Sequence, residues 1–283
     1  MTPSKNPSIF FEITDRCNHS CTFCGKSWRT NSEHSLSYDD IDIILSYDKN
    51  AGKISGGEPG LEKQKCFYYF QHETAPKYLN TNLTLWTGHE LSLLQSLNVY
   101  FIINAPSTDQ KEYAAVTYST RYDSFMKNIY NINPDHTTIS IVLNEINIGT
   151  VEKSFIQYLD IGFKNFLLSP MIPSHKSFFD YIHAIHVIDR LYRTYPEVTI
   201  RTLSKTLECV APPSHLCHSG TDMLVVLSTG DVVPCAWNNN HILGNIRTDT
   251  YEQIKENGRQ YRSSITGTVC QGFLENYQRY HHV

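Results

Sequence analysis

Three cysteines lie close together near the start of the chain, in the run Arg16-Cys17-Asn18-His19-Ser20-Cys21-Thr22-Phe23-Cys24. Their C-x3-C-x2-C spacing gathers three thiolates in one short loop, where they can bind three irons of an iron–sulfur cube and leave the fourth iron open. A structural zinc site instead closes four ligands around the metal. Two alternatives to a cluster stay open, namely three unrelated buried thiols or a zinc site completed by His19 or His34. With 8 cysteines in 283 residues, a chance triplet of this spacing is rare, and the spacing favours the cluster.

A second motif, Gly56-Gly57-Glu58-Pro59, follows the apolar run Ala51-Gly52-Lys53-Ile54-Ser55. Paired glycines after a strand let a ligand approach the backbone closely, and a carboxylate there can bind an ammonium group. The cysteines likewise follow an apolar, β-rich run, residues 8–14, which predicts a strand. The cysteine loop is therefore expected at the carboxyl end of a strand, where α/β folds place their active sites.

Together these residues resemble the radical S-adenosylmethionine enzymes, and the resemblance covers almost the whole chain. It implies that the three cysteines hold a catalytic 4Fe–4S cluster whose open iron chelates the amino and carboxylate groups of S-adenosylmethionine (SAM). Phe23 would lie near the adenine. The Gly-Gly-Glu motif would bind the methionine ammonium, and the cofactor-contacting residues of this turn are Gly56, Gly57, Glu58 and Pro59. An external donor of the flavodoxin or ferredoxin type would supply one electron. This electron cleaves the sulfonium and gives a 5′-deoxyadenosyl radical that abstracts a substrate hydrogen.

Strand and helix patterns alternate after these motifs without internal repeats. Strands are predicted at 77–85, 99–104, 137–143 and 165–169, and helices at 37–47, 89–97, 109–116, 122–132, 151–159 and 177–195. Repeated β/α units indicate an α/β fold with a parallel sheet. The resemblance implies a partial (β/α)6 TIM-like barrel, open on one side.

Two segments depart from the pattern of the family. Asn80-Thr81-Asn82-Leu83 stands where many relatives have Thr-Asn-Gly, and Asn104-Ala105-Pro106-Ser107 stands where they often have Ser-Leu-Asp-Gly. Both segments would lie at strand ends near the cofactor. Candidates for ribose or substrate contacts are therefore Asn82, Asn104 and Asn144, although ordinary turn residues at strand ends would look the same.

The last third of the chain carries four more cysteines, Cys209, Cys217, Cys235 and Cys270. A β-hairpin around Gly230 and a helix starting near Thr250 are predicted between them. This order resembles the SPASM and twitch extensions of radical SAM enzymes, which bind auxiliary 4Fe–4S clusters. We therefore expect a barrel domain at 1–205, an auxiliary-cluster domain at 206–283, and one auxiliary cluster. Cys209 is either its fourth ligand or a packed thiol that leaves an iron open, and Cys66 is expected to be a structural thiol.

Composition restricts the remaining classes. A net charge of −4 argues against nonspecific nucleic-acid binding, and no apolar run is long enough for a membrane span. The polar start has no signal peptide, so a cytoplasmic location with reduced thiols is expected rather than a secreted disulfide framework.

The substrate is the least defined feature. Relatives with such extensions mostly modify ribosomally made peptides, which gives the first hypothesis, a peptide maturase. Only about seven residues precede the first predicted strand, so leader recognition would need a separate small partner protein. The second hypothesis is a small-molecule dehydrogenase acting on aminoglycoside-type alcohols, which the compact chain and single auxiliary cluster favour. A non-enzymatic iron–sulfur carrier is a third, but it would not need the Gly-Gly-Glu-Pro motif.

Overall fold

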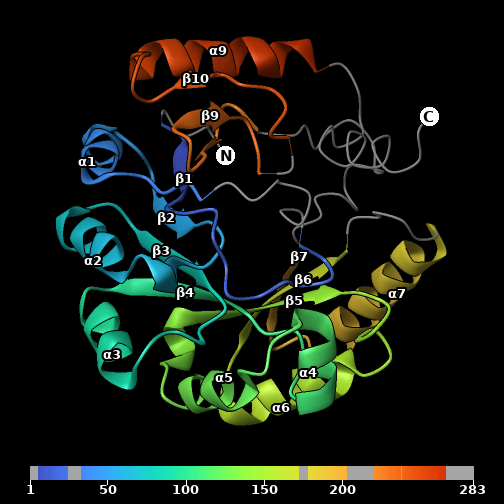
Figure 1. Ribbon diagram of the computed structural model, residues 1–283. Coiled ribbons are helices and arrows are strands. Elements are labelled where there is room, and N and C mark those ends of the chain that lie inside the picture. The colour runs from blue at the N-terminus through green and yellow to red at the C-terminus, as the bar shows by residue number, and fades with distance from the viewer. Residues whose placement is uncertain (1–5, 25–32, 172–177, 203–218, 237, 266–283) are drawn as a thin grey trace.

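A single curved sheet organises the protein (Figure 1). The computed structural model describes residues 6–24, 33–171, 178–202, 219–236 and 238–265. Seven parallel strands follow one another in chain order, and they are β1 (Ser8–Glu12), β2 (Gly52–Ser55), β3 (Lys77–Thr81), β4 (Val99–Asn104), β5 (Thr137–Leu143), β6 (Asn165–Pro170) and β7 (Thr199–Thr202). The α/β fold predicted from the sequence, a partial TIM-like barrel, is therefore confirmed.

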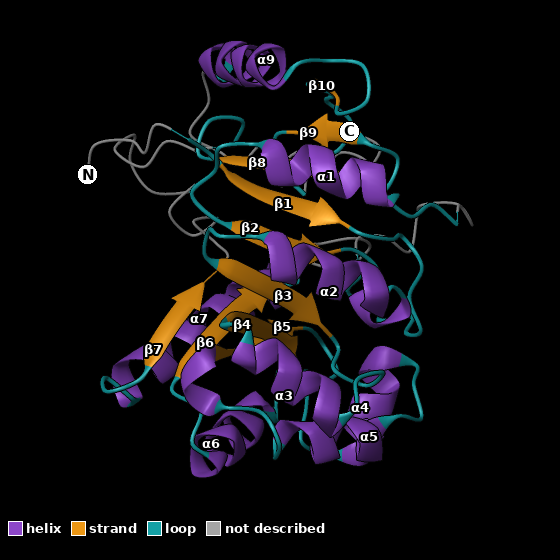
Figure 2. Ribbon diagram, turned by 90° about the vertical axis from the view of Figure 1, so that its left-hand side faces the viewer, coloured by secondary structure: helices purple, strands orange, loops and turns teal. Residues whose placement is uncertain are grey.

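Helices cover the outer face of the sheet (Figures 1 and 2). They are α1 (Tyr38–Ser46), α2 (Lys63–His72), α3 (Gly88–Ser96), α4 (Gln110–Thr117), α5 (Tyr122–Ile129), α6 (Val151–Ile161) and α7 (Phe178–Thr194), with short 3-10 turns at Pro59–Leu61 and Pro134–His136. The predicted capping box at the start of α1 is present, since Ser37 Oγ accepts from the Asp40 N–H and the Asp40 carboxylate accepts from the Ser37 N–H. Alternate strand residues such as Ile9 and Phe11 are buried in the core.

One strand boundary and one strand differ from the prediction. Strand β3 ends at Thr81 rather than Leu85, because Leu83 adopts a left-handed conformation with φ of 68° and turns the chain away from the sheet. Strand β7 was not predicted, although the β-branched run Val198-Thr199-Ile200 after Pro196 is a strand signal that could have revealed it.

The carboxyl-terminal part extends the same sheet. The predicted hairpin forms β8 (Met223–Val226) and β9 (Asp231–Val233), followed by β10 (Gly244–Asn245) and the predicted helix α9 (Tyr251–Ser264). Strand β8 pairs in parallel with β1, so the ten strands run β10-β9-β8-β1-β2-β3-β4-β5-β6-β7. The proposed division at residue 205 thus crosses a continuous sheet.

Side chains also join this part to α1. Arg247 Nε and Nη2 donate to Asp40 Oδ1 and Oδ2 at 2.8 and 2.9 Å. The Arg247 guanidinium is the main reason that the pKa of Asp40 is lowered to about 2. Beside this pair, the rings of Tyr47 and Tyr251 stack with centroids 4.1 Å apart. These contacts hold the carboxyl-terminal part against the first helix of the barrel.

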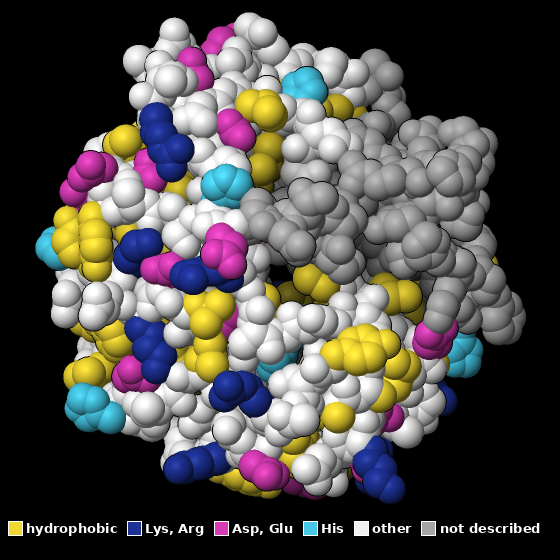
Figure 3. Space-filling model, in the orientation of Figure 1, with side chains coloured by type: hydrophobic (Ala, Val, Ile, Leu, Met, Phe, Trp, Pro, Cys, Tyr) yellow, Lys and Arg dark blue, Asp and Glu magenta, His cyan; other side chains and the backbone are white. Residues whose placement is uncertain are grey.

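The surface is of mixed charge. On the described part of the face in Figure 3, basic and acidic side chains are interspersed, and the centre of the face is hollowed beside the grey residues. Among the helices of the described residues, none is both long and apolar enough to cross a membrane.

Candidate functional site

The cysteine loop, residues 17–24, directly follows β1. Its second half is fastened to the end of α4, because the N–H groups of Ser20 and Thr22 donate to the carbonyls of Thr117 and Val116 at 3.1 and 2.9 Å. The N–H of Cys24 donates to the carbonyl of Cys21 at 3.0 Å and closes a tight turn between two of the predicted ligands. In this loop Cys17 is exposed, and Cys21 and Cys24 are partly exposed.

The three thiols lie near enough to influence one another electrostatically. Burial, together with the neighbouring thiolates of Cys24 and Cys17, raises the pKa of Cys21 well above its ordinary value. Gathering three thiolates here therefore requires a compensating cation, as bound metal provides. Among the described residues, no three His, Cys, Asp or Glu side chains converge on a point that could hold a single metal ion. In a cube each cysteine binds a different iron, so its ligands need not share such a point.

The Gly-Gly-Glu-Pro turn packs against the backbone that leads into the cysteine loop. The N–H of Gly57 donates to the carbonyl of Thr14 at 2.7 Å, and the N–H of Glu58 donates to that of Arg16 at 2.8 Å. A Cβ added at Gly57 would lie 1.8 Å from the Arg16 carbonyl oxygen, and Gly56 has φ of 134°. Only glycines allow this close approach. The two predicted motifs therefore meet at the carboxyl ends of adjacent strands β1 and β2.

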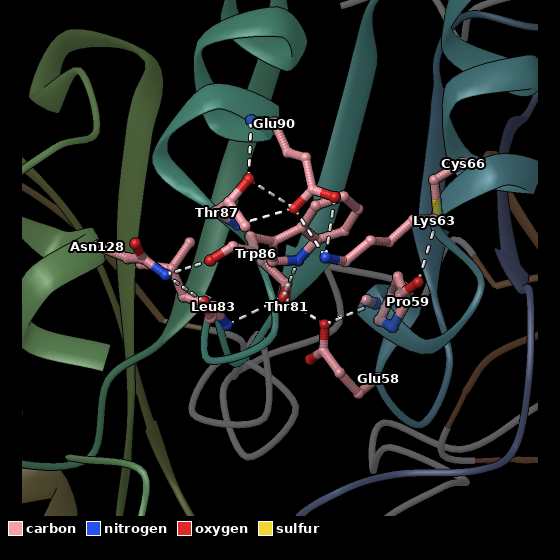
Figure 4. A network of polar contacts seen from close by, with 11 residues as sticks. Glu58, Pro59, Lys63, Cys66, Thr81, Leu83, Trp86, Thr87, Glu90 and Asn128 are labelled. Carbon is pink, nitrogen blue, oxygen red and sulfur yellow. Dashed lines mark hydrogen bonds and ion pairs between the residues drawn. The ribbon is translucent and has the colours of Figure 1, made fainter. Parts of the chain in front are cut away.

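Glu58 lies beneath this turn and is only 1% exposed. Its Oε1 accepts from the N–H of Gly60 at 2.8 Å and from Thr81 Oγ1 at 2.6 Å, while Oε2 accepts from the N–H of Asn82 at 2.7 Å. Figure 4 shows the carboxylate pointing toward Thr81, whose hydroxyl also accepts from Trp86 Nε1 at 3.0 Å. Burial raises the pKa of Glu58 despite these donors. A carboxylate offers about four acceptor positions, so one remains for an ammonium group.

The loop after β3 adopts the backbone shape that the Thr-Asn-Gly pattern would give, but with leucine in the position of glycine. Leu83 is buried with φ of 68°, a conformation that costs a non-glycine residue roughly 1–2 kcal/mol. Asn128 of α5 holds the strained loop, since its Nδ2 donates to the carbonyls of Leu83 and Trp86 at 3.0 and 2.8 Å (Figure 4). No motif or pattern in the sequence indicated Asn128.

The other predicted cofactor contacts fall into different environments. Asn104 ends β4, and its Oδ1 is buried without a hydrogen-bond partner. Ser169 Oγ, near the end of β6, is also buried without a hydrogen-bond partner. Unpaired buried polar atoms at strand ends fit a bound polar ligand such as a ribose. The Asn144 side chain instead stabilises the turn in which it lies, because its Oδ1 accepts from the N–H of Ile146 at 2.9 Å. Phe23 is partly exposed within the cysteine loop.

The two histidines considered for a zinc site, His19 and His34, lie in different environments. His19 is 8% exposed, and both of its ring nitrogens lack hydrogen-bond partners. Its ring packs against the ring of Tyr113 in a T-shaped arrangement, with the ring centroids 6.1 Å apart. Burial, with a smaller contribution from Arg121, lowers the pKa of His19 to about 4, so the imidazole is neutral near pH 7. His34 pairs with Asp15, with Nδ1 3.3 Å from Oδ2. The sequence analysis considered His19 only as a possible zinc ligand, and its buried, neutral and unpartnered state was not predicted.

The predicted auxiliary ligands are only partly visible. Cys235 follows β9 and is partly exposed, and its carbonyl accepts from the N–H of Asn238 at 3.0 Å. The remaining three, Cys209, Cys217 and Cys270, lie outside the described residues. Cys66 is fully buried in α2, with Sγ 3.5 Å from the Pro59 carbonyl oxygen, which accords with a structural thiol.

Comparison with known proteins shows relatives of the fold and of the carboxyl-terminal domain. Residues 217–279 match the SPASM family, described as an iron-sulfur cluster-binding domain. The solved structure of native anSMEcpe with bound AdoMet has a TM-score of 0.69 and 16% identity, covering 97% of this chain and 96% of that one. Streptococcus suis SuiB bound to precursor peptide SuiA has a TM-score of 0.69 and 14% identity, covering 89% of this chain and 65% of SuiB. No curated protein matches the sequence.

These similarities confirm the fold that the resemblance implied. The chain has the fold of the radical SAM enzymes and carries a SPASM iron–sulfur domain at its carboxyl end. Among the residues that the structure describes, the Gly-Gly-Glu turn contacts the backbone that leads into the cysteine loop.

Proposed function

We propose that the protein is a radical SAM enzyme that modifies a ribosomally made peptide. The observation that carries the proposal is the direct contact between the two motifs, through the hydrogen bonds of Gly57 and Glu58 to the backbone before Cys17. When bound, the reduced cluster and SAM supply the electron and the 5′-deoxyadenosyl radical that abstracts a substrate hydrogen.

The residues of the chain bind and orient these groups. Cys17, Cys21 and Cys24 would hold three irons and leave the fourth facing the Gly-Gly-Glu turn. The remaining acceptor position of Glu58, with the backbone of Gly56 and Gly57, would hold the methionine ammonium. The unpaired Asn104 Oδ1 and Ser169 Oγ would receive polar groups of the nucleoside.

The carboxyl-terminal cysteines would hold the auxiliary cluster. Cys217, Cys235 and Cys270 fall within the matched SPASM region, and Cys209 lies just before it. We assign all four as ligands of one 4Fe–4S cluster. The pairing of β8 with β1 would place this cluster on the sheet that also carries the cysteine loop.

A peptide substrate is supported by proteins that share the fold. Native anSMEcpe was solved with bound AdoMet and the Kp18Cys peptide, and SuiB with its precursor peptide SuiA. Recognition of a leader segment would come from a separate small protein, and the electron from a flavodoxin or ferredoxin.

Anaerobic turnover tests both levels of the proposal. The reconstituted protein, supplied with SAM and a reductant, should form 5′-deoxyadenosine, and the variant with all three loop cysteines changed to Ala should form none. A short precursor peptide encoded beside the gene should stimulate 5′-deoxyadenosine formation. Mass spectrometry should then show that the peptide has lost hydrogen. Activity with a sugar alcohol but not with the peptide would support the dehydrogenase alternative instead. Failure of the wild-type protein to cleave SAM would refute the proposed chemistry.

A further inference from the structure

Asn82 is bonded to both motifs of the site. Its backbone N–H donates to Glu58 Oε2 at 2.7 Å, beneath the Gly-Gly-Glu turn. Its side-chain Nδ2 donates to Asn18 Oδ1 at 2.8 Å, and Asn18 directly follows the predicted cluster ligand Cys17. One residue after β3 therefore joins the turn after β2 to the loop after β1.

The Asn82 amide is committed to the protein. Its Oδ1 accepts from the N–H and the hydroxyl of Thr84 at 3.1 and 2.7 Å, which uses both lone pairs of the oxygen. Thr84 Oγ1 in turn accepts from Asn18 Nδ2 at 2.9 Å and closes a ring of three side chains. Asn82 and Thr84 are buried, at 6% and 4% exposed, whereas Asn18 is partly exposed. This arrangement leaves the amide oxygen no capacity for the ribose contact expected from the sequence.

The ring complements the other attachment of the cysteine loop. Ser20 and Thr22 fasten the second half of the loop to the end of α4. Near Cys17, the side chain of Asn18 makes the corresponding attachment to the loop after β3. The loop is thus held from both sides.

We infer that the Asn82 amide is a positioning group that fixes the cysteine loop relative to the Gly-Gly-Glu turn. This inference rests on the proposed function, because the positioned groups are then the open iron and the bound SAM. Loss of the amide leaves the three cysteines and Glu58 in the chain, but the distance between the cysteine loop and the Glu58 carboxylate is then less tightly fixed. Because the lost hydrogen bond no longer holds the site in its binding geometry, the affinity for SAM should fall by roughly three- to tenfold.

The experiment compares Asn82→Ala, Asn18→Ala and the double variant in the reconstituted full-length protein. Iron content, SAM affinity by titration, and the change in the electron paramagnetic resonance spectrum on adding SAM are measured for each. Both single variants should retain iron, bind SAM more weakly, and show a smaller spectral change. The double variant should be no worse than either single variant, because both remove the same contact. Hydrogen exchange of residues 17–24 in the cluster-free protein should also be faster.

Asn128→Ala is the matched control. Asn128 is as buried as Asn82 and makes two hydrogen bonds to the same loop, but it bonds to neither Asn18 nor Glu58. This variant should lower the melting temperature while leaving SAM affinity and the spectral change as in the wild type. If Asn82→Ala does not fold, Asn18→Ala, on a partly exposed loop position, carries the test alone.

Three outcomes would overturn the inference. They are wild-type behaviour in Asn82→Ala and Asn18→Ala, equal loss of SAM affinity in Asn128→Ala, or multiplied losses in the double variant. Each requires a wild-type protein that binds SAM, so each is distinguishable from failure of the proposed function, in which the wild type itself does not bind.

Discussion

Replacing Glu58 tests the carboxylate that lies between the two motifs. In Glu58→Gln, the retained carbonyl oxygen can still accept from Gly60 and Thr81, but the new amide meets the N–H of Asn82 donor to donor. One unsatisfied buried donor costs about 1–3 kcal/mol, so the free energy of unfolding should fall by that amount. In Glu58→Ala, the backbone donors of both Gly60 and Asn82 are left unsatisfied, and the loss should be roughly 2–6 kcal/mol.

The same substitutions test SAM binding. A carboxylate–ammonium hydrogen bond is worth roughly 1.5–3 kcal/mol, so the affinity for SAM should fall about tenfold to a hundredfold in Glu58→Gln. Both clusters should remain, because Glu58 is not among the proposed ligands. Urea unfolding and SAM titration of the same reconstituted preparation separate the two effects.

The results discriminate clearly. A Glu58→Gln variant with wild-type stability would refute the role of the carboxylate in holding the loop after β3. A destabilised variant with unchanged SAM affinity would retain that role and move the ammonium contact to the backbone of Gly56 and Gly57.

Three further predictions concern the clusters and the attachment of the carboxyl-terminal part. Reconstituted protein should hold about eight iron atoms, and changing the three loop cysteines to Ala should remove about half of them, as iron and sulfide assays would show. Cys209→Ala should alter the electron paramagnetic resonance signal of the auxiliary cluster, whereas Cys66→Ala should not; an unchanged Cys209→Ala spectrum would mean three cysteine ligands. Arg247→Met should lower the free energy of unfolding by about 1–2 kcal/mol at neutral pH, after allowance for the half-exposed guanidinium. Because the pKa of Asp40 is lowered from 3.8 to about 2 in the folded protein, the stability difference between wild type and variant should disappear as the pH falls from 3.8 to about 2. A stability difference that persists in acid would mean that the variant loses packing rather than the ion pair.

The local signals in the sequence predicted most of the fold. The capping box at Ser37 and the apolar, β-rich run that forms β1 are features of short segments, and the structure contains both. The motif spacing predicted which side chains would gather, since residues at the carboxyl ends of adjacent parallel strands must meet. Strand β7 was missed because it is only four residues long and follows a proline-containing turn.

The contacts within the site could not be predicted in the same way. Glu58 accepts hydrogen bonds from Thr81 and Asn82, more than twenty positions away, and Asn18 reaches Asn82 across 64 positions. These pairs depend on the register of three strands and on the left-handed turn at Leu83. A leucine in that conformation gives no sequence signal, because the pattern there normally calls for glycine. The sequence therefore indicated Asn82 as a residue of the site without indicating what it contacts.

Strand β1 explains how the two predicted cluster regions are related in space. It leads directly into the cysteine loop, and it pairs with β2, which leads into the Gly-Gly-Glu turn. On its other side it pairs with β8, whose hairpin partner β9 leads into Cys235. Main-chain hydrogen bonds across β2, β1, β8 and β9 therefore connect the Gly-Gly-Glu turn, the cysteine loop and Cys235 within a single sheet. Strand geometry, together with the Arg247–Asp40 pair, fixes the position of Cys235 relative to the cysteine loop, so the two regions are parts of one sheet rather than two independently moving domains.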